Sequence, residues 1–202
     1  MDSLIHSDNI IIEVNKALNI VLHKYLNPID NNINIRFDLP EVNSTQSEPT
    51  VSIFLYDIHE DLQLRSSELR NYDYKNKILS PGWVNINCNY LITYWDVNKP
   101  SNDSSSPDSQ PDNQSIKIMN RVLNALINSR QLDKIPNSYT KIIPQQESLN
   151  SLGNFWQALG NRPRLSLFYS ITVPMKLQDI QDVIMPINQM SVTVDQKSSS
   201  DD

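Results

Sequence analysis

The chain has 202 residues, of which 39% are hydrophobic, so it is long enough to bury one sizeable core and too short for two comfortable domains. Its formal net charge of −6 argues against nucleic acid as the main partner, because neutralising phosphates requires clustered lysine and arginine. No apolar run is long enough to cross a bilayer, and the first residues lack the basic and apolar regions of a signal peptide, so no direct membrane insertion is expected.

Cysteine and glycine set two further limits on function. The single cysteine, Cys88, excludes an internal disulfide and indicates synthesis in a reducing compartment. The three glycines are too scattered to form either of the glycine-rich loops that cradle nucleotide phosphates. Nucleotide-binding modules of those types are therefore not expected.

The first part of the chain predicts one helix followed by strands. Residues 7–26 repeat apolar side chains at helical spacing. Alternating apolar and polar residues predict a half-buried strand over 33–37, and the nearly all-apolar stretch 51–56 predicts a strand covered on both faces. The charged stretch that follows, 57–70, is predicted to form a turn or a short irregular helix.

The clearest period-two pattern in the chain lies in residues 84–95. Apolar and aromatic side chains occupy one face of this predicted strand from Val84 to Tyr94, while asparagines begin the other face, which turns apolar towards its end. A low-complexity stretch rich in Ser, Asp, Asn and Pro follows at residues 98–115. We interpret it as an insertion within one domain, because regular patterns resume directly after it.

The second part of the chain predicts two more helices and two more strands. A helix over 116–129 carries an apolar stripe that includes Ile116 and Ile127. The remaining predicted elements are a short strand, a third helix and an alternating strand, at residues 139–143, 146–159 and 165–173.

This order of elements predicts an α+β, or mixed α/β, fold with a largely antiparallel sheet of four to five strands and about three helices packed on it. Residues 1–97 and 116–180 form a single domain in this interpretation. Residues 98–115 are its insertion, and 181–202 form an extended C-terminal tail whose end is expected to be disordered.

The dense polar cluster at the end of a predicted strand consists of Asp57, His59, Glu60 and Asp61. Histidine and carboxylates are sound metal ligands, so a small metal-dependent hydrolase that uses Asp57, His59 and Glu60 is one hypothesis. The other two histidines lie in or before the first helix without matching spacing, and acidic residues after a strand are usually solvated turn residues or helix caps. The solvated interpretation is therefore preferred, and no metal site is predicted.

The remaining candidate side chains do not indicate catalysis. Cys88 lies mid-strand on an apolar face, where a cysteine behaves as a small hydrophobe and not as a nucleophile. Tryptophan is common at interface hot spots, although core packing is the alternative, and arginines before a strand are either rim contacts or ordinary solvated charges. The predicted interface residues are Asp57, Glu60, Asp61, Arg65, Trp83, Trp95, Arg162 and Arg164.

Three motifs together resemble one protein family. They are VSIFLYDIHEDLQLR at 51–65, YLITYW at 90–95 and LGNFWQALGNRPRLSLFYSITVP at 152–174, with an FDLP step at 37–40. In order and spacing they resemble the cap, or tail-terminator, proteins of extracellular contractile injection systems, the phage-tail-like particles of the antifeeding-prophage and Photorhabdus-virulence-cassette type.

The resemblance implies a structural protein and no enzyme, with no catalytic residues and no cofactor. Such caps form a hexameric ring of identical subunits at the distal end of the particle. They close the inner tube, contact the contractile sheath and end polymerisation. The resemblance further implies assembly in the bacterial cytoplasm and then incorporation into a particle that is released or retained. A monomeric assembly adaptor or chaperone is the other alternative to this structural role.

Overall fold

The computed structural model of the chain describes residues 8–28, 32–39, 48–62, 72–73, 75, 78–79, 82–97, 109–133, 135–142, 156–157 and 164–177. The helices and strands in these ranges are α1 (Ile10–Leu26), β1 (Asn34–Arg36), β2 (Thr50–Glu60), β3 (Tyr72–Asp73), β4 (Ile78–Leu79), β5 (Trp83–Trp95), α2 (Gln114–Asn128), β6 (Tyr139–Ile142) and β7 (Ser166–Lys176).

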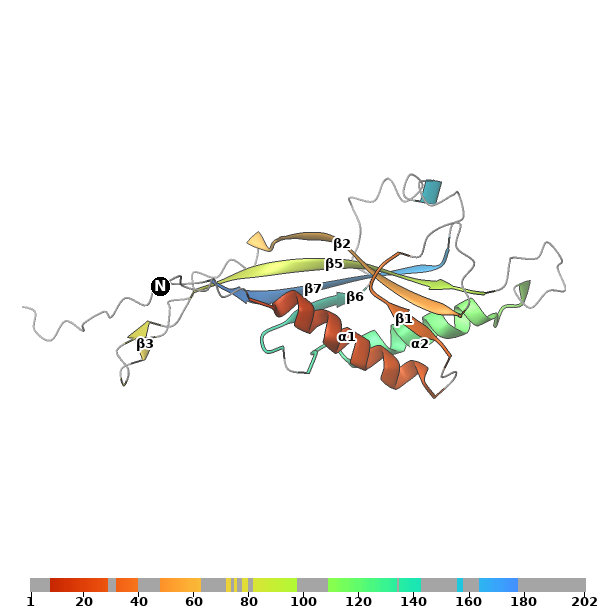
Figure 1. Ribbon diagram of the computed structural model, residues 1–202, viewed down its shortest axis with the longest axis horizontal. Helices are drawn as coiled ribbons and strands as arrows, with labels where there is room; N and C mark the ends of the chain where they lie inside the picture. The colour runs from red at the N-terminus through yellow and green to blue at the C-terminus, as the bar shows by residue number, and fades with distance from the viewer. Residues whose placement is uncertain are drawn as a thin grey trace, which may run out of the picture.

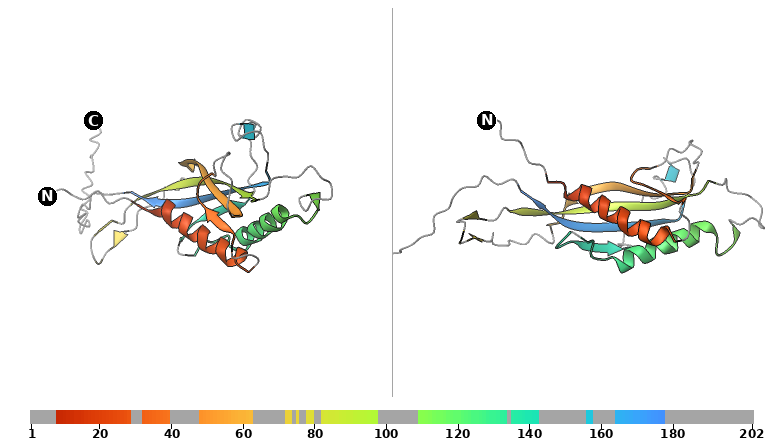
Figure 2. Two further views of the ribbon diagram at one scale, coloured as in Figure 1. Left: turned by 45° about the vertical axis from the view of Figure 1, so that its right-hand side comes forward. Right: turned by 60° about the horizontal axis from the view of Figure 1, so that its bottom comes forward.

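The main sheet has five strands in the order β1-β2-β5-β7-β6, and β3 and β4 form a separate two-stranded sheet (Figure 1). All neighbours in the main sheet are antiparallel except β1 and β2, which run parallel. Both helices lie on one side of this sheet, here called the helix side; the opposite side is called the far side (Figure 2). The predicted α+β fold with a largely antiparallel sheet is therefore confirmed, with one parallel pair.

Helix α1 packs on the sheet through residues spaced four apart. Val14, Leu18, Leu22 and Leu26 are all buried, as the helical period of the sequence predicts. At the start of the helix, Asp8 accepts a hydrogen bond from the backbone N–H of Ile10 at 2.8 Å. Its second carboxylate oxygen accepts one from the Lys176 N–H, also at 2.8 Å, so this side chain joins α1 to the end of β7.

Helix α2 buries the middle of its predicted apolar stripe, at Met119, Val122 and Leu126. Two other members of the stripe, Ile116 and Ile127, are exposed to solvent at 43% and 44%. Packing against α1 and the sheet selects the helix orientation, and it leaves these two isoleucines outside. The buried residues of α2 are Ile118, Met119, Val122, Ala125 and Leu126.

The core lies between the helices and the helix side of the three long strands. Because side chains alternate along a strand, every second residue of β2, β5 and β7 faces the helices. The buried residues contributed by these strands are Val51, Ile53, Cys88, Tyr90, Ile92, Tyr94, Tyr169, Ile171 and Val173. The far side of β5 is also buried towards its end, at Leu91, Thr93 and Trp95.

One predicted element is wrong where it can be compared with the structure. Residues 57–60, predicted as a turn or irregular helix, continue strand β2, because they pair in register with β5. Two boundaries also shift: α2 begins at Gln114, inside the stretch predicted as an insertion, and β7 continues past Val173 to Lys176.

Parts of other predictions lie outside the described residues. Of the predicted third helix only Trp156 and Gln157 are described; both are helical, and Trp156 is buried. Residues 98–108 of the predicted insertion and the whole tail 181–202 also lie outside the described ranges.

Candidate assembly surfaces

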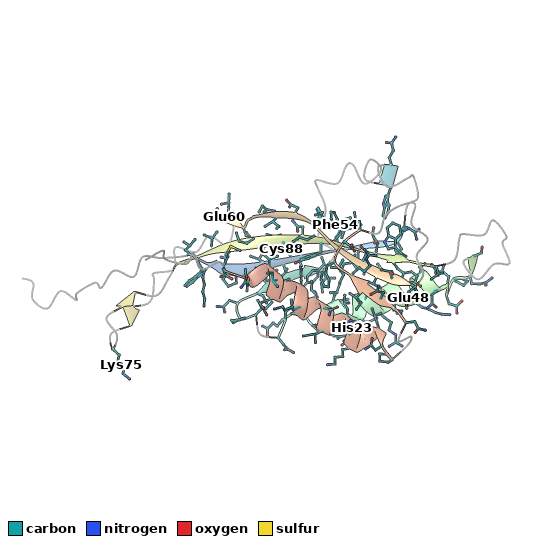
Figure 3. The ribbon with its side chains drawn as sticks, viewed as in Figure 1. His23, Glu48, Phe54, Glu60, Lys75 and Cys88 are labelled. Carbon is teal, nitrogen blue, oxygen red and sulfur yellow. The ribbon has the colours of Figure 1, made fainter. Side chains whose placement is uncertain are left out.

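The described members of the predicted interface set are spread along β5. Glu60 and Asp61 lie beside its first part, where Trp83 is the first residue, whereas Asp57 pairs with Asn89 at the middle of the strand. Trp95 is its last residue, and at about 3.3 Å per residue the two tryptophans are about 40 Å apart along the strand. Figure 3 shows Glu60 at one end of the sheet and Glu48, which precedes β2, near the other.

Arg164 lies beside the last residue of β5, because it contacts Trp95. Arg65 and Arg162 lie outside the described residues, so their placement stays a prediction.

A β-bulge places the acidic end of β2. Leu55 pairs with Tyr90 and Asp57 pairs with the neighbouring Asn89, so Tyr56 is an extra residue in β2. The alternation of side chains changes phase at this point, because one extra residue shifts all that follow. Consequently Asp57 and the residues at odd positions after it lie on the far side.

On the far side, Asp57 is the acceptor of a small polar cluster. The Asn89 side-chain amide donates to Asp57 Oδ2 at 2.9 Å, and His59 Nδ1 lies 2.9 Å from the same oxygen. The hydrogen bond from Asn89 is the main reason that the pKa of the Asp57 carboxyl is below its ordinary value; His59 lowers it further, and partial burial acts in the opposite direction. The cluster therefore favours the ionised form of Asp57.

The ligands of the hypothetical metal site do not converge. Glu60 follows His59 on a regular strand, so it lies on the helix side while Asp57 and His59 lie on the far side. The Asp61 carboxylate instead accepts a hydrogen bond from Thr172 Oγ1 at 3.0 Å. Within the described ranges, no three His, Cys, Asp or Glu side chains are grouped so that they could hold a metal ion.

A second polar network crosses β5 and β7 on the far side. Asn87 donates to Thr172 Oγ1 at 3.0 Å and accepts from Ser170 Oγ at 2.9 Å, and Thr172 in turn donates to Asp61. Asn87, Ser170 and Thr172 are all buried. The sequence pattern alone does not reveal this network as a unit, although the alternating asparagines of β5 and the alternating Ser and Thr of β7 are its signals. Only the strand register shows that they meet.

Trp95 does not present its ring to solvent within this chain. It is 6% exposed, and its indole N–H donates to Thr93 Oγ1 at 2.8 Å. The Arg164 guanidinium stacks over the ring at 4.2 Å from its centroid. The accessible group at this end is therefore the half-buried Arg164, which Trp95 orients. At the other end, Trp83 is half-buried and pairs with Lys176.

No helix in the described part of the chain is long and apolar enough to span a membrane. The family described as the Pvc16 N-terminal domain matches residues 13–189. The comparison with curated proteins finds no match.

Two solved structures are similar to nearly the whole chain. One is the sheath/tube terminator, in its extended state, of the extracellular contractile injection system PVC; it is 57% identical, with a TM-score of 0.77, and the match covers 95% of this chain and 65% of that one. The other is the tube-terminating cap of the anti-feeding prophage, 52% identical with a TM-score of 0.75, covering 91% of this chain and 61% of that one. This chain thus spans less than two thirds of either.

Proposed function

This chain belongs to the Pvc16 N-terminal domain family, and from that premise we propose that it is a structural cap of a contractile injection system that closes the distal end of the inner tube and sheath and ends their polymerisation. The observation that carries the proposal is the 57% identity over 95% of the chain to a sheath/tube terminator. At that identity the fold is shared, which supports a shared place in the particle.

The cap acts without catalysis and without a cofactor. It assembles as a ring of identical subunits, a hexamer, on the last rings of tube and sheath protein. Assembly takes place in the bacterial cytoplasm, and the cap then stays in the finished phage-tail-like particle. The separation of the acidic group on β2 from Arg164 beside the last residue of β5 supports this role, because a cap subunit needs different surfaces for its ring neighbours and for tube or sheath protein.

Among the predicted contact residues, we assign Asp57, Glu60 and Trp83 to contacts with a neighbouring subunit. Glu60 ends β2 and Trp83 begins β5, at the end of the sheet that extends beyond the helices (Figure 1), whereas Asp57 lies three residues before Glu60 on the far side. We assign Arg164 to contacts with tube or sheath protein. Asp61 has a positioning role, since its carboxylate is bound by Thr172.

Deletion of the chain from its producer strain tests the proposal, with particles examined by electron microscopy. We expect tubes and sheaths of irregular length without a closed distal end, and re-expression of the wild-type chain restores uniform, closed particles. Uniform, fully sheathed particles in the deletion strain would contradict a capping role. Mass spectrometry of purified wild-type particles separates a cap from an assembly chaperone, because only a cap remains in them.

A further inference from the structure

The solvent face of α2 combines exposed isoleucines with positive charge. Ile116 and Ile127 are about three helical turns apart and therefore nearly in line along the helix. Lys117 and Arg121 are also exposed on the solvent side of α2, about 100° and 140° around the helix axis from Ile116, and α2 contains no Asp or Glu in a chain whose net charge is −6. Asp112 pairs with Lys117 at 2.9 Å, whereas Arg121 makes no ion pair with a described residue.

At the other end of the sheet, β2 extends beyond the helix layer. Ile58 and Glu60 both face the helix side, yet Ile58 is 49% exposed because neither helix reaches it. The strands beside it continue an apolar surface on the same side, where the side chains are only half-buried. These half-buried neighbours on β5 and β7 are Val84, Ile86 and Met175.

The two surfaces are complementary but cannot meet within one molecule. The overhang presents apolar side chains and the Glu60 carboxylate, and the α2 face presents isoleucines and the Arg121 guanidinium. Figure 3 shows Glu60 at the end of β2, and Figure 1 shows that this end of β2 lies away from α2. Opposite ends with complementary charge and apolar area join copies head to tail, which is the heterologous contact that closes a ring.

We propose that the overhang of β2, with Ile58 and Glu60, docks on the α2 face of a second copy, so that α2 of one subunit continues the helix layer under the sheet of the next. In this contact Ile127 and Ile116 pack on the apolar overhang, and Arg121 pairs with Glu60. The inference rests on the proposed ring and adds to it which two surfaces of the chain form the contact.

Charge reversal of the full-length chain tests the pairing. Glu60→Arg and Arg121→Glu are each expected to weaken subunit association about tenfold or more, because like charges then face one another across the contact. The double variant, Glu60→Arg with Arg121→Glu, is expected to restore it. Lys24→Glu, which makes the same charge change at an exposed position of α1, is the matched control and leaves association unchanged. Native mass spectrometry and light scattering give the oligomeric state, and circular dichroism checks that each variant is folded.

A cysteine pair tests the contact without relying on charge. In a chain carrying Ile58→Cys and Ile127→Cys, mild oxidation is expected to give a ladder of disulfide-linked oligomers, and neither single variant forms a ladder beyond the dimer. Native Cys88 does not interfere, because it is fully buried.

Three results would overturn the contact: rings of the single charge variants as stable as the Lys24→Glu control, a double variant that stays dissociated, or a cysteine-pair chain that gives no ladder. The first two leave the capping role standing, since capping is judged by particle length in the deletion strain.

Discussion

At the residue scale, two buried tyrosines with different hydrogen bonding offer a direct comparison. The rings of Tyr90 and Tyr169 lie 6.1 Å apart in the core. The Tyr90 hydroxyl donates to Asn15 Oδ1 at 2.8 Å, whereas the buried Tyr169 hydroxyl has no hydrogen-bond partner among the described residues. A buried hydroxyl without a partner loses its bonds to water on folding and gains nothing in exchange.

We expect Tyr169→Phe to leave the free energy of unfolding unchanged or to raise it by up to about 1 kcal/mol. Tyr90→Phe removes a hydrogen bond at the same ring volume and is expected to lower it by about 1 kcal/mol. Urea unfolding followed by circular dichroism measures both. A Tyr169→Phe variant that is less stable than Tyr90→Phe would show that the hydroxyl of Tyr169 is bonded after all.

At the element scale, the two helices begin with asparagines that differ in what their side chains do. Asn113, the N-cap of α2, accepts a hydrogen bond from the Ile116 N–H at 2.9 Å. Asn9, the N-cap of α1, makes no such bond, because Asp8 accepts from the first turn instead. The two asparagine side chains, at the same helix position, are therefore expected to contribute differently to the free energy of unfolding.

Asn113→Ala is expected to lower the free energy of unfolding by about 1 kcal/mol, the usual loss on removing a side-chain cap. Asn9→Ala is the matched control and is expected to change it by only a few tenths of a kcal/mol. Chemical denaturation of the two variants gives the comparison. Equal losses would show that the Asn113 hydrogen bond contributes nothing beyond helix propensity.

The local sequence pattern predicts which helices and strands form better than it predicts which face of each is buried and where each one ends. The period of four in α1 and the alternation of β5 depend only on neighbouring residues, so both elements follow from sequence. The bulge at Tyr56 depends on how β2 pairs with β5, and without it the charged residues after Tyr56 resemble a turn. Likewise α2 has more apolar residues than one face can hold, so packing decides that Ile116 stays outside.

The sequence allowed candidate contact residues to be chosen, but it did not predict where they lie in the fold. No sequence pattern relates Asp57 to Trp95, and no motif indicates that the described members of the set are spread along β5 from its first residue to its last. The network joining Asp61 to Thr172 links positions 111 residues apart. Such contacts are fixed by strand order and register, which a single sequence does not encode in any short motif.

At the scale of the whole molecule, titratable groups in the folded chain predict a plateau of stability with losses on both sides. Hydrogen bonds from Asn89 and Arg36 are the main causes that lower the pKa of Asp57 and of Asp38 respectively. The stabilisation from such carboxylates is complete above their unfolded pKa of about 4 and is lost as pH falls through the lower folded value. Acid unfolding is therefore expected to begin only below about pH 4.

On the alkaline side, burial, with a contribution from the charge of Asp57, raises the pKa of Cys88 from 9.0 to about 11. Burial likewise raises the pKa of Tyr90 and of Tyr169. Folding holds these groups in the protonated form, so their contribution is complete below the unfolded pKa and is lost as pH rises. Between pH 9 and 11 the buried thiol alone gives a slope of up to about 1.4 kcal/mol per pH unit.

The Cys88→Ala variant tests this slope, because alanine cannot titrate. The variant also loses packing, and that loss is the same at every pH, so the slope of the unfolding free energy against pH is compared and not its magnitude. We expect a shallower decline than wild type between pH 9 and 11, and an unchanged acid limb, measured by urea unfolding at half-unit steps of pH. Tyr169→Phe is the control: it leaves the decline from pH 9 to 10 in place and reduces it only above about pH 10, where an unfolded tyrosine ionises. Identical slopes for Cys88→Ala and wild type would mean that the thiol ionises as readily in the folded chain as in the unfolded one.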